Sequence, residues 1–428
     1  MSAAPAVAHR AVRSGAPRPR LVIFTTHPIQ YQAPLFRELA SRESFETIVL
    51  FGSRHGLDVS LDRGFGATFQ WDIPLLEGYE HEFVENVAST PDVDSFTGIR
   101  VNDARGLLQR LDASAVLVLG WQAIAHLQFM RAARALGIPL FIRGESNLLR
   151  RLPRGPKALL RSILWLPVRE LLYRAMFSAA QEFLVIGTRN AEFYRHFGVP
   201  DARLRWAPYA VDNARFALEP SARAAARGSH RDALGIAADA IAFIVPAKII
   251  ERKRPFDALA AFATVAAEDP RAHLIYLGDG PERARLETAI RAHRLSERVS
   301  ITGFVNQRAI PGWYATGDCV MLLSDSRETW GLAINEGMAG GLAPIVSDAV
   351  GCAPDLVRPG ENGFTYPLGD VGALAAAMRS YLALSDAERA AMALRSREII
   401  AGYTVAGVAD AIAAAVADRV ATRGASPR

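Results

Sequence analysis

The chain has 428 residues, which is too long for one small domain and predicts two domains. Half of the residues are hydrophobic and 22% are charged, a balance that excludes a chain disordered throughout. The two cysteines, Cys319 and Cys352, are too few for a disulfide framework or a four-thiolate zinc site, so a reducing, cytoplasmic compartment is expected.

Lysine and arginine outnumber aspartate and glutamate by 49 to 44, and two segments carry the excess. Residues 1–19 are rich in Ala, Pro and Arg and lack the apolar centre of a secretory signal, so a flexible tail is predicted. Residues 148–177 carry seven basic residues against Glu170 alone, interleaved with Leu, Ile, Trp and Phe. This pattern suits a helix on an anionic membrane, or core residues beside a solvated basic face. No run of about 18 apolar residues exists, so no transmembrane helix is expected.

The first half of the chain alternates β-like apolar runs with helix-length segments, which predicts parallel βαβ units. These runs are Leu21–His27, Phe45–Phe51, Ser114–Gly120, Ile138–Gly144 and Glu182–Gly187. The pattern is interrupted near Pro208, and the Ala/Arg/Ser-rich residues 221–229 have the composition of an interdomain connection. We therefore predict a first α/β domain over residues 20–216.

The same alternation begins again at Ile241 and predicts a second doubly wound sheet, in a domain over residues 217–404. Its six apolar runs begin at Ile241, His273, Val299, Asp318, Leu342 and Asn362. In open sheets of this kind, ligands bind outside the carboxyl ends of the strands. The loops that follow each strand are therefore the places to look for chemistry.

The most informative loop runs from Ser324 to Asp348 and leads into a helix that begins at Gly331. A helix N-terminus offers unpaired N–H groups and partial positive charge, so this one is a plausible phosphate site. Glu328 and Glu336 flank it, and carboxylates accept hydrogen bonds from sugar hydroxyls well. The alternative is that both acids simply favour the helix dipole.

Two other strand-end loops carry weaker signals. Lys248 ends the strand that begins at Ile241, and Lys253 follows five residues later, an arrangement that suits a diphosphate or, alternatively, a solvated charged loop. The sequence GDGPER from Gly278 is a tight strand-to-helix turn and is weak evidence of phosphate binding by itself.

Together these motifs resemble a specific family. The pair Glu328 and Glu336 (EX7E), the two lysines, LGDGPER at 277, GFV at 303 and VRPGENGF at 357 are similar to the carboxyl-terminal half of retaining, nucleotide-sugar-dependent glycosyltransferases of family 4. In the first half, THPIQYQAPLFREL at 26, GW at 120, RGES at 143 and PYAVDNARF at 208 resemble a bacterial surface-polysaccharide branch of that family. The resemblance implies an α/β GT-B fold, in which two doubly wound Rossmann-like domains face each other across a cleft.

The resemblance also implies roles for individual residues. Glu336 would hold the nucleotide ribose, and Glu328 would lie beside the donor sugar near the anomeric carbon. Four residues would face the diphosphate or the sugar, namely Lys248, Lys253, Gly331 and Leu332. Backbone groups of Gly303, Phe304 and Val305 would hold the base. No metal or cofactor is implied beyond the nucleotide-diphosphate sugar, because fixed cations and a helix N-terminus stabilise the leaving group.

The first domain is harder to interpret, since the family's histidine after an amino-domain strand has no clear equivalent. His27, Trp121 and Arg143 are candidate cleft residues on the acceptor side. By resemblance, residues 405–428 form a helix that crosses back to the first domain. The acceptor would be a glycan or a lipid-linked sugar, which fits a peripheral location at the inner face of the cytoplasmic membrane. No nucleic-acid module is recognised.

The function expected is therefore retaining transfer of a sugar from a nucleotide donor to an acceptor hydroxyl in polysaccharide or glycolipid biosynthesis. Two alternatives remain open at this stage. A GT-B epimerase or phosphorylase could use the same donor contacts, and a non-catalytic glycan- or membrane-binding subunit could retain the fold.

Overall fold

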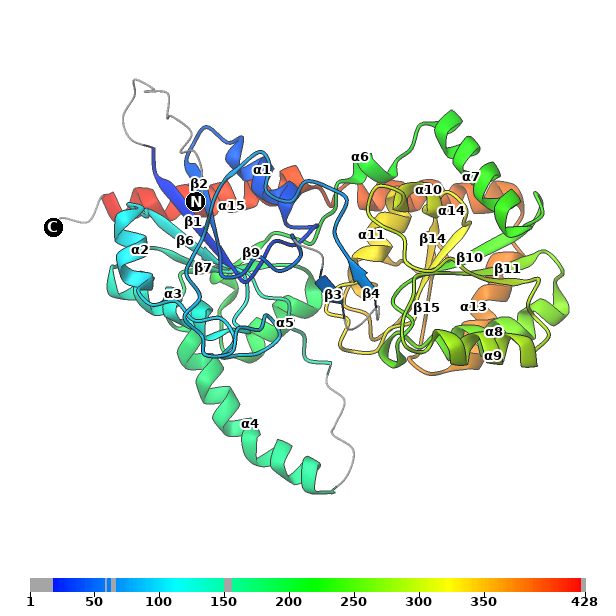
Figure 1. The fold of residues 1–428 in the computed structure, drawn as a ribbon, viewed down its shortest axis with the longest axis horizontal. Helices are drawn as coiled ribbons and strands as arrows, with labels where there is room; N and C mark the ends of the chain where they lie inside the picture. Colours follow the sequence, from blue (N-terminus) through cyan, green and yellow to red (C-terminus); the bar gives the residue numbers. More distant parts are fainter. Residues whose placement is uncertain (1–17, 58–59, 63–66, 150–155, 425–428) are drawn as a thin grey trace, which may run out of the picture.

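The structure is a computed structural model that describes residues 18–57, 60–62, 67–149 and 156–424. Two lobes lie side by side, each built on a parallel β-sheet with helices on both faces (Figure 1). This arrangement confirms the predicted fold class of two Rossmann-like domains. The tail predicted for residues 1–19 lies almost wholly outside the described residues.

The first sheet has seven parallel strands in the order β5-β2-β1-β6-β7-β8-β9. Their bounds are β1 Arg20–Thr25, β2 Glu46–Phe51, β5 Glu80–Phe83, β6 Ala115–Val118, β7 Leu140–Ile142, β8 Glu182–Val185 and β9 Leu204–Trp206. A separate antiparallel pair, β3 (Ser60–Asp62) and β4 (Ala67–Phe69), lies beside the second lobe in Figure 1. Strand order reverses between β1 and β6, which is where sheets of this type open a ligand crevice.

Helices cover both faces of the first sheet because its strands are apolar on both sides, as buried parallel strands are. One face is packed by α2 (Ala104–Arg110), α3 (Ile124–Ala135), α5 (Thr188–His196) and the end of α4 (Pro156–Phe177). The other face is packed by α1 (Ala33–Ala40) and by the distant α15 (Val405–Gly424). The last helix of the chain therefore completes the core of the first lobe.

The second sheet has six parallel strands in the order β12-β11-β10-β13-β14-β15. Their bounds are β10 Ile241–Pro246, β11 Ala272–Leu277, β12 Val299–Ile301, β13 Cys319–Leu322, β14 Ala343–Ser347 and β15 Phe364–Tyr366. The six predicted apolar runs thus all contain strands. The helices of this lobe are α6 Asn213–Phe216, α7 Pro220–Leu234, α8 Pro255–Glu268, α9 Arg283–Ala292, α10 Ile310–Tyr314, α11 Leu332–Ala339, α12 Ala353–Leu356, α13 Val371–Leu382 and α14 Asp386–Ile400. Two 3₁₀ turns, η1 Asp201–Arg203 and η2 Glu251–Lys253, complete the elements.

One sequence interpretation is wrong. Residues 221–229, which we interpreted as an interdomain connection, lie inside the helix α7. Two arginines fix this helix to the second lobe, because Arg227 and Arg231 each donate to Asp318 at 2.7 Å. Alanine and arginine are both good helix formers, so the composition that suggested a linker also suits an exposed helix held by ion pairs.

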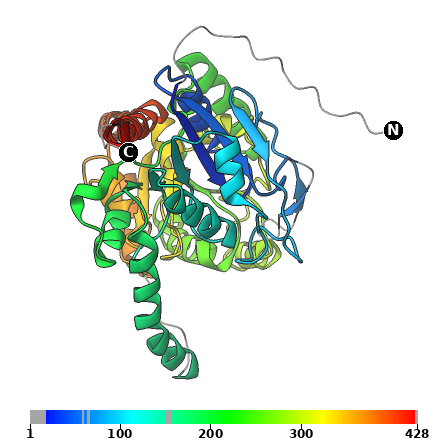
Figure 2. The ribbon, with the colours of Figure 1, turned by 90° about the vertical axis from the view of Figure 1, so that its left-hand side faces the viewer.

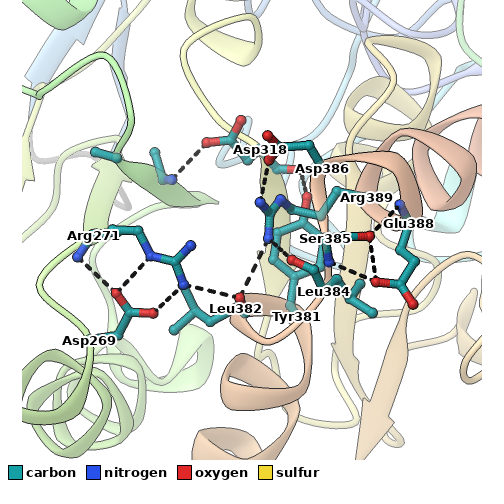
Figure 3. Close-up of polar contacts among 12 residues, drawn as sticks. Asp269, Arg271, Asp318, Tyr381, Leu382, Leu384, Ser385, Asp386, Glu388 and Arg389 are labelled. Atoms are coloured by element: carbon teal, nitrogen blue, oxygen red, sulfur yellow. Dashed lines mark hydrogen bonds and ion pairs between the residues drawn. The ribbon is translucent and has the colours of Figure 1, made fainter.

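Asp318 also borders a polar network where α13 meets α14 (Figure 3). Its backbone oxygen accepts a hydrogen bond from the Tyr381 hydroxyl at 2.8 Å. Nearby, Ser385 and Glu388 form a capping box that begins α14, and Arg389 binds the carbonyl of Leu384. These contacts satisfy the polar groups between the two helices and hold them against the strand ends.

The helix α4 extends away from the body of the molecule in both views (Figures 1 and 2). Its C-terminal turns pack on the first lobe through Tyr173, Met176 and Phe177. On the opposite side, Val168, Leu171 and Leu172 are exposed, at 46%, 69% and 59% of their surface. The side chains of residues 150–166, which carry five of the seven basic residues of the 148–177 segment, lie outside the described part.

Candidate active site

The loop between β13 and α11 is fixed by a glycine that no other residue could replace without strain. Gly331 is the N-cap of α11 with φ 104°, and a Cβ there would lie 2.6 Å from Leu322 and 3.0 Å from Val350. The backbone of Leu332 then begins the helix, and the first N–H groups of a helix have no carbonyl one turn before them to bind. The position predicted for a phosphate site is therefore a true helix N-terminus.

A cavity of about 380 Å³ opens between the two lobes at this helix. Glu328, Gly331, Leu332 and Glu336 line it from the second lobe. Three further residues of the second lobe complete its wall, namely Gln307, Thr329 and Trp330. The first lobe contributes Gln30, Tyr31, Pro34, Arg37, Ile73, Pro74 and Glu145. The segment that joins the lobes contributes Tyr209, Val211, Asp212, Arg215 and Phe216. The volume is in the range that small-ligand sites occupy.

Glu336 points into this cavity from the second turn of α11. Its Oε2 accepts a hydrogen bond from the Tyr314 hydroxyl at 2.7 Å. Burial raises the pKa of Glu336 to about 7, against the lowering influence of Tyr314 and Arg215. The carboxylate is thus held in place on one side by Tyr314, and Arg215 approaches it from the segment that joins the lobes.

Glu328 has the opposite electrostatic environment. Burial alone would raise its pKa, but the ion pair with Lys253 and the nearby Arg252 together lower it. The side chains of Lys253 and Glu328 are only 13% and 17% exposed. Glu328 is therefore ionised at neutral pH, and it is bound to one of the two lysines predicted to hold a diphosphate.

The other predicted donor residues are not among those that line the cavity. Lys248 follows β10 and is half-buried in the loop that leads to η2. Gly303 has φ 75° in the loop after β12, and Val305 packs on the hydrophobic cluster of α11. Phe304 lies between them, half-buried. Their roles in binding the diphosphate and the base stay predictions.

The first-lobe candidates occupy three different environments. His27 is half-buried beside His55, with ring centroids 5.2 Å apart, and burial lowers its pKa to about 4. Trp121 stacks on Phe193 within an aromatic cluster and donates from Nε1 to the Tyr173 hydroxyl at 3.3 Å. Neither lines the cavity. Arg143 is buried and lines a smaller cavity of about 40 Å³ that adjoins the main one.

Sequence reasoning did not single out three other side chains that line the cleft, two from the first lobe and one from the segment that joins the lobes. Tyr31, Glu145 and Arg215 lie within the quoted segments THPIQYQAPLFREL, RGES and PYAVDNARF, but we did not single them out. Burial raises the pKa of Glu145 to about 7, and Glu328 adds to this while Arg143 opposes it. A signal existed for Tyr31 and Glu145, since each follows a β-like run.

The lobes contact each other around the cavity through hydrogen bonds on two sides. Asp355 of α12 accepts from the backbone N–H and the hydroxyl of Thr188, the hydroxyl at 2.7 Å. On the other side, Asp72 accepts from the Arg308 N–H at 3.0 Å, and Asn306 donates to the Gln70 carbonyl at 2.8 Å. The two domains therefore enclose the cleft in a closed arrangement.

Two observations bear on metal and membrane. Within the described ranges, no group of three or more His, Cys, Asp or Glu side chains is arranged to hold a metal ion. None of the helices seen in the structure is both long enough and apolar enough to cross a membrane.

Comparison with known proteins agrees with this architecture. Residues 226–398, most of the second lobe, match the family described as glycosyl transferases group 1. The chain is 33% identical over 136 residues to 2-deoxystreptamine N-acetyl-D-glucosaminyltransferase of Streptomyces fradiae, covering 32% of this chain and 31% of that protein. It is 30% identical over 136 residues to alpha-monoglucosyldiacylglycerol synthase of Acholeplasma laidlawii, covering 32% of this chain and 34% of that protein. The matched stretches thus span about a third of each of these two relatives.

The solved structures extend the likeness to both lobes. HepE of Anabaena, solved in complex with UDP, superposes with a TM-score of 0.69 at 18% identity, over 94% of this chain and 100% of that one. The two lobes thus have the two-domain GT-B fold, and the second lobe carries the sequence pattern of glycosyl transferases group 1.

Proposed function

We propose that this protein is a glycosyltransferase that moves a sugar from a nucleotide-diphosphate sugar to a hydroxyl of a glycan or lipid-linked acceptor. The observation that carries the proposal is that Glu328, Glu336 and the N-terminus of α11 line one cavity between the two lobes. The family match of the second lobe and the named activities of the curated relatives support it. The UDP complex of the similarly folded HepE supports a nucleotide donor.

In this proposal the second lobe holds the donor. The Glu336 carboxylate accepts hydrogen bonds from the ribose hydroxyls, and Glu328 accepts from hydroxyls of the sugar. Cleavage of the sugar–phosphate bond places negative charge on the departing diphosphate. The N–H groups of Gly331 and Leu332, the ammonium groups of Lys248 and Lys253, and the guanidinium of Arg215 stabilise that charge without a metal ion.

Lys253 has a double role under this proposal. It pairs with Glu328 in the structure, and a bound diphosphate would share its charge. An ammonium group has three donors and rotates freely, so it can bind two acceptors at once. Donor binding would therefore leave Glu328 paired and ionised.

We further propose that transfer retains the anomeric configuration and that the protein works at the inner face of the cytoplasmic membrane. The exposed side chains of Val168, Leu171 and Leu172 on the projecting helix α4, in a segment rich in arginine, support contact with an anionic lipid surface. Alpha-monoglucosyldiacylglycerol synthase, to judge by its name, acts on a lipid acceptor. These features favour a lipid-linked acceptor over a free oligosaccharide.

The test is to incubate the purified chain, in EDTA, with a panel of UDP-, GDP- and ADP-sugars and to follow both nucleoside diphosphate release and sugar products. Release from one nucleotide class, increased by lipid-linked saccharides, is the expected result. A new sugar product without any acceptor would show an epimerase instead, and transfer to inorganic phosphate would show a phosphorylase. Donor binding without turnover under any condition would show a non-catalytic subunit.

A further inference from the structure

Residues 70–74 follow β4 and reach from the first lobe to the second, and we call them the bridging segment (Figure 1). Both oxygens of the Asp72 carboxylate accept from the Arg308 N–H, at 3.0 and 3.2 Å. The Asn306 amide donates to the Gln70 carbonyl at 2.8 Å, and its oxygen accepts from the Asp72 N–H at 3.4 Å. The bridging segment is therefore docked on the loop between β12 and α10.

The first lobe holds both ends of the bridging segment. Arg37 of α1 donates to the Pro74 carbonyl at 3.0 Å. At the other end, the side-chain amide of Gln70 donates to the Leu57 carbonyl at 2.6 Å. A short segment fixed at both ends presents its side chains in a defined position, which is the condition for a precise binding wall.

The loop that the bridging segment contacts belongs to the nucleoside end of the proposed donor site. Gln307 stands between Asn306 and Arg308 and lines the main cavity. Arg215 donates to the side-chain oxygen of Gln307 at 3.1 Å and also to its carbonyl. The positive charge of Arg215 also acts on Glu336, the proposed ribose ligand. Gln307 and Glu336 therefore mark the same end of the cavity.

Ile73 and Pro74 bring the first lobe into this end of the cavity. Both residues line it, and they follow directly after Asp72, which is bound beside Gln307. Ile73 is half-buried and Pro74 is exposed, so each has apolar surface that a ligand can cover. Small-molecule sites combine apolar walls of this kind with a few placed polar groups, here the carboxylate of Glu336.

We propose that Ile73 and Pro74 form the first-lobe wall of the nucleoside site, and that Asp72 positions them against the loop that holds the base. The donor is then bound by both lobes, with its ribose on Glu336 and one face of the nucleoside against the bridging segment. Because Asp72 and Arg308 belong to different lobes, nucleoside binding and lobe closure stabilise each other. This inference rests on the proposed function and adds first-lobe residues to the donor site of the second lobe.

The first test is amide hydrogen exchange of the wild-type chain with UDP, GDP and ADP, and with inorganic pyrophosphate as a probe that lacks a nucleoside. The nucleoside diphosphate that binds should slow exchange in residues 71–73 at least about fivefold, because contact with the nucleoside restricts local opening. Pyrophosphate should leave exchange in these residues unchanged. Unchanged exchange with the bound nucleoside diphosphate, or equal slowing by pyrophosphate, would overturn the inference.

The second test uses variants and calorimetric titration with the same ligands. Asp72→Ala should raise the Kd of the nucleoside diphosphate about tenfold, the usual effect of losing one hydrogen bond to a charged group, and leave the Kd of pyrophosphate unchanged. Asp72→Asn, which still accepts from the Arg308 N–H, should bind within about threefold of wild type. Ile73→Ala should weaken nucleoside diphosphate binding about fivefold by removing apolar surface. In each variant kcat at saturating donor should be retained, since this wall acts on binding.

Thr188→Val is the matched control, because it removes a hydroxyl that donates to Asp355 across the other side of the cleft. It weakens a contact between the lobes without touching the bridging segment. The ratio of its Kd values for the nucleoside diphosphate and for pyrophosphate should therefore equal that of the wild type.

If Asp72→Ala and Ile73→Ala bound the nucleoside diphosphate as tightly as the wild type, the inference would be overturned and the proposed function left intact. Equal weakening of both ligands by Asp72→Ala would also overturn the inference. A folded wild-type chain that binds no nucleoside diphosphate and no nucleotide sugar would overturn both.

Discussion

At the scale of single residues, burial and neighbouring charges shift the pKa values of the cleft carboxyl groups in different directions. The cations beside Glu328 hold its pKa below the usual range, whereas burial raises the pKa of Glu336 and Glu145 to about 7. A buried acid with a raised pKa favours the folded state most when it is protonated. Its favourable contribution is present below the unfolded pKa, near 4.5, and is lost as the pH rises through 7.

Removing the charge from Glu336 should therefore stabilise the protein in alkaline solution. A glutamine at this position still accepts the Tyr314 hydrogen bond through its carbonyl but cannot ionise. We expect Glu336→Gln to raise Tm at pH 8 and to change it little at pH 5, by thermal unfolding monitored with circular dichroism. The quantity compared is the Tm of the variant minus the Tm of the wild type. If this difference were lower at pH 8 than at pH 5, this account of the site would be contradicted.

Glu328 should matter for turnover more than for affinity. We expect Glu328→Gln to lower kcat by about 10²- to 10³-fold, the usual effect of removing one preorganised polar contact to the transition state. Nucleotide affinity, measured by calorimetry, should be retained. Glutamine is the better test than alanine because it preserves a polar partner for Lys253. An unchanged kcat would remove Glu328 from the reacting end of the donor.

The sequence predicted some of these residues and not others for a physical reason. Glu328 and Glu336 belong to one loop and one helix, so their spacing in the chain already places them together. Glu145 and Tyr31 reach the cavity only after the first sheet has formed and the two lobes have met. Their proximity to Glu328 depends on contacts between distant segments, such as Asn147 with Ser326, which spacing does not reveal.

At the scale of elements, the apolar runs predicted strands well, whereas strands without such a run were missed. The missed strands β5 and β9 are short and lie at the edges of the first sheet, where polar side chains such as Glu80 and Arg205 are tolerated. The helix α7 was missed because its surface is polar and its stability depends on ion pairs to Asp318. Composition alone does not distinguish such a helix from a linker.

The helix α15 should contribute strongly to the stability of the first lobe. Ile412 is 2% exposed in the cluster that α15 forms with α1 and the first sheet. We expect Ile412→Ala to lower the free energy of unfolding by about 2–5 kcal/mol, as for other buried isoleucines. The control is Asp410→Ala, which removes an exposed ion pair with Arg42 and should cost about 1 kcal/mol or less. If Ile412→Ala and Asp410→Ala lowered the free energy of unfolding equally in urea, the packing described would be contradicted.

The projecting part of α4 makes a separate prediction about membranes. Leu171→Glu with Leu172→Glu should weaken binding to anionic phospholipid vesicles by at least about tenfold, since one buried leucine contributes about 1.5–3 kcal/mol. Leu394→Glu is a matched control on α14, where the leucine is 55% exposed. The measurement is vesicle co-sedimentation at fixed salt. Equal binding by the wild type and the double variant would exclude this helix face as the contact.

At the scale of the whole molecule, the function proposed depends on two lobes that meet around one cavity. The contacts of Asp355 with Thr188 and of Asp72 with Arg308 hold the lobes together on two sides. Closure of this kind excludes water that would hydrolyse the donor. The predicted GT-B fold is confirmed, whereas the boundary near residue 216 and the individual site roles stay predictions.

The most direct test of the central claim is calorimetric titration of the purified protein, in EDTA, with UDP-, GDP- and ADP-sugars, compared with Glu336→Ala. We predict that one nucleotide class binds the wild type. The variant should bind it about 10- to 100-fold more weakly, because a hydrogen bond to a charged group contributes about 1.5–3 kcal/mol. If the folded wild type bound none of them, or if the variant bound as tightly as the wild type, the cleft would not be the donor site described.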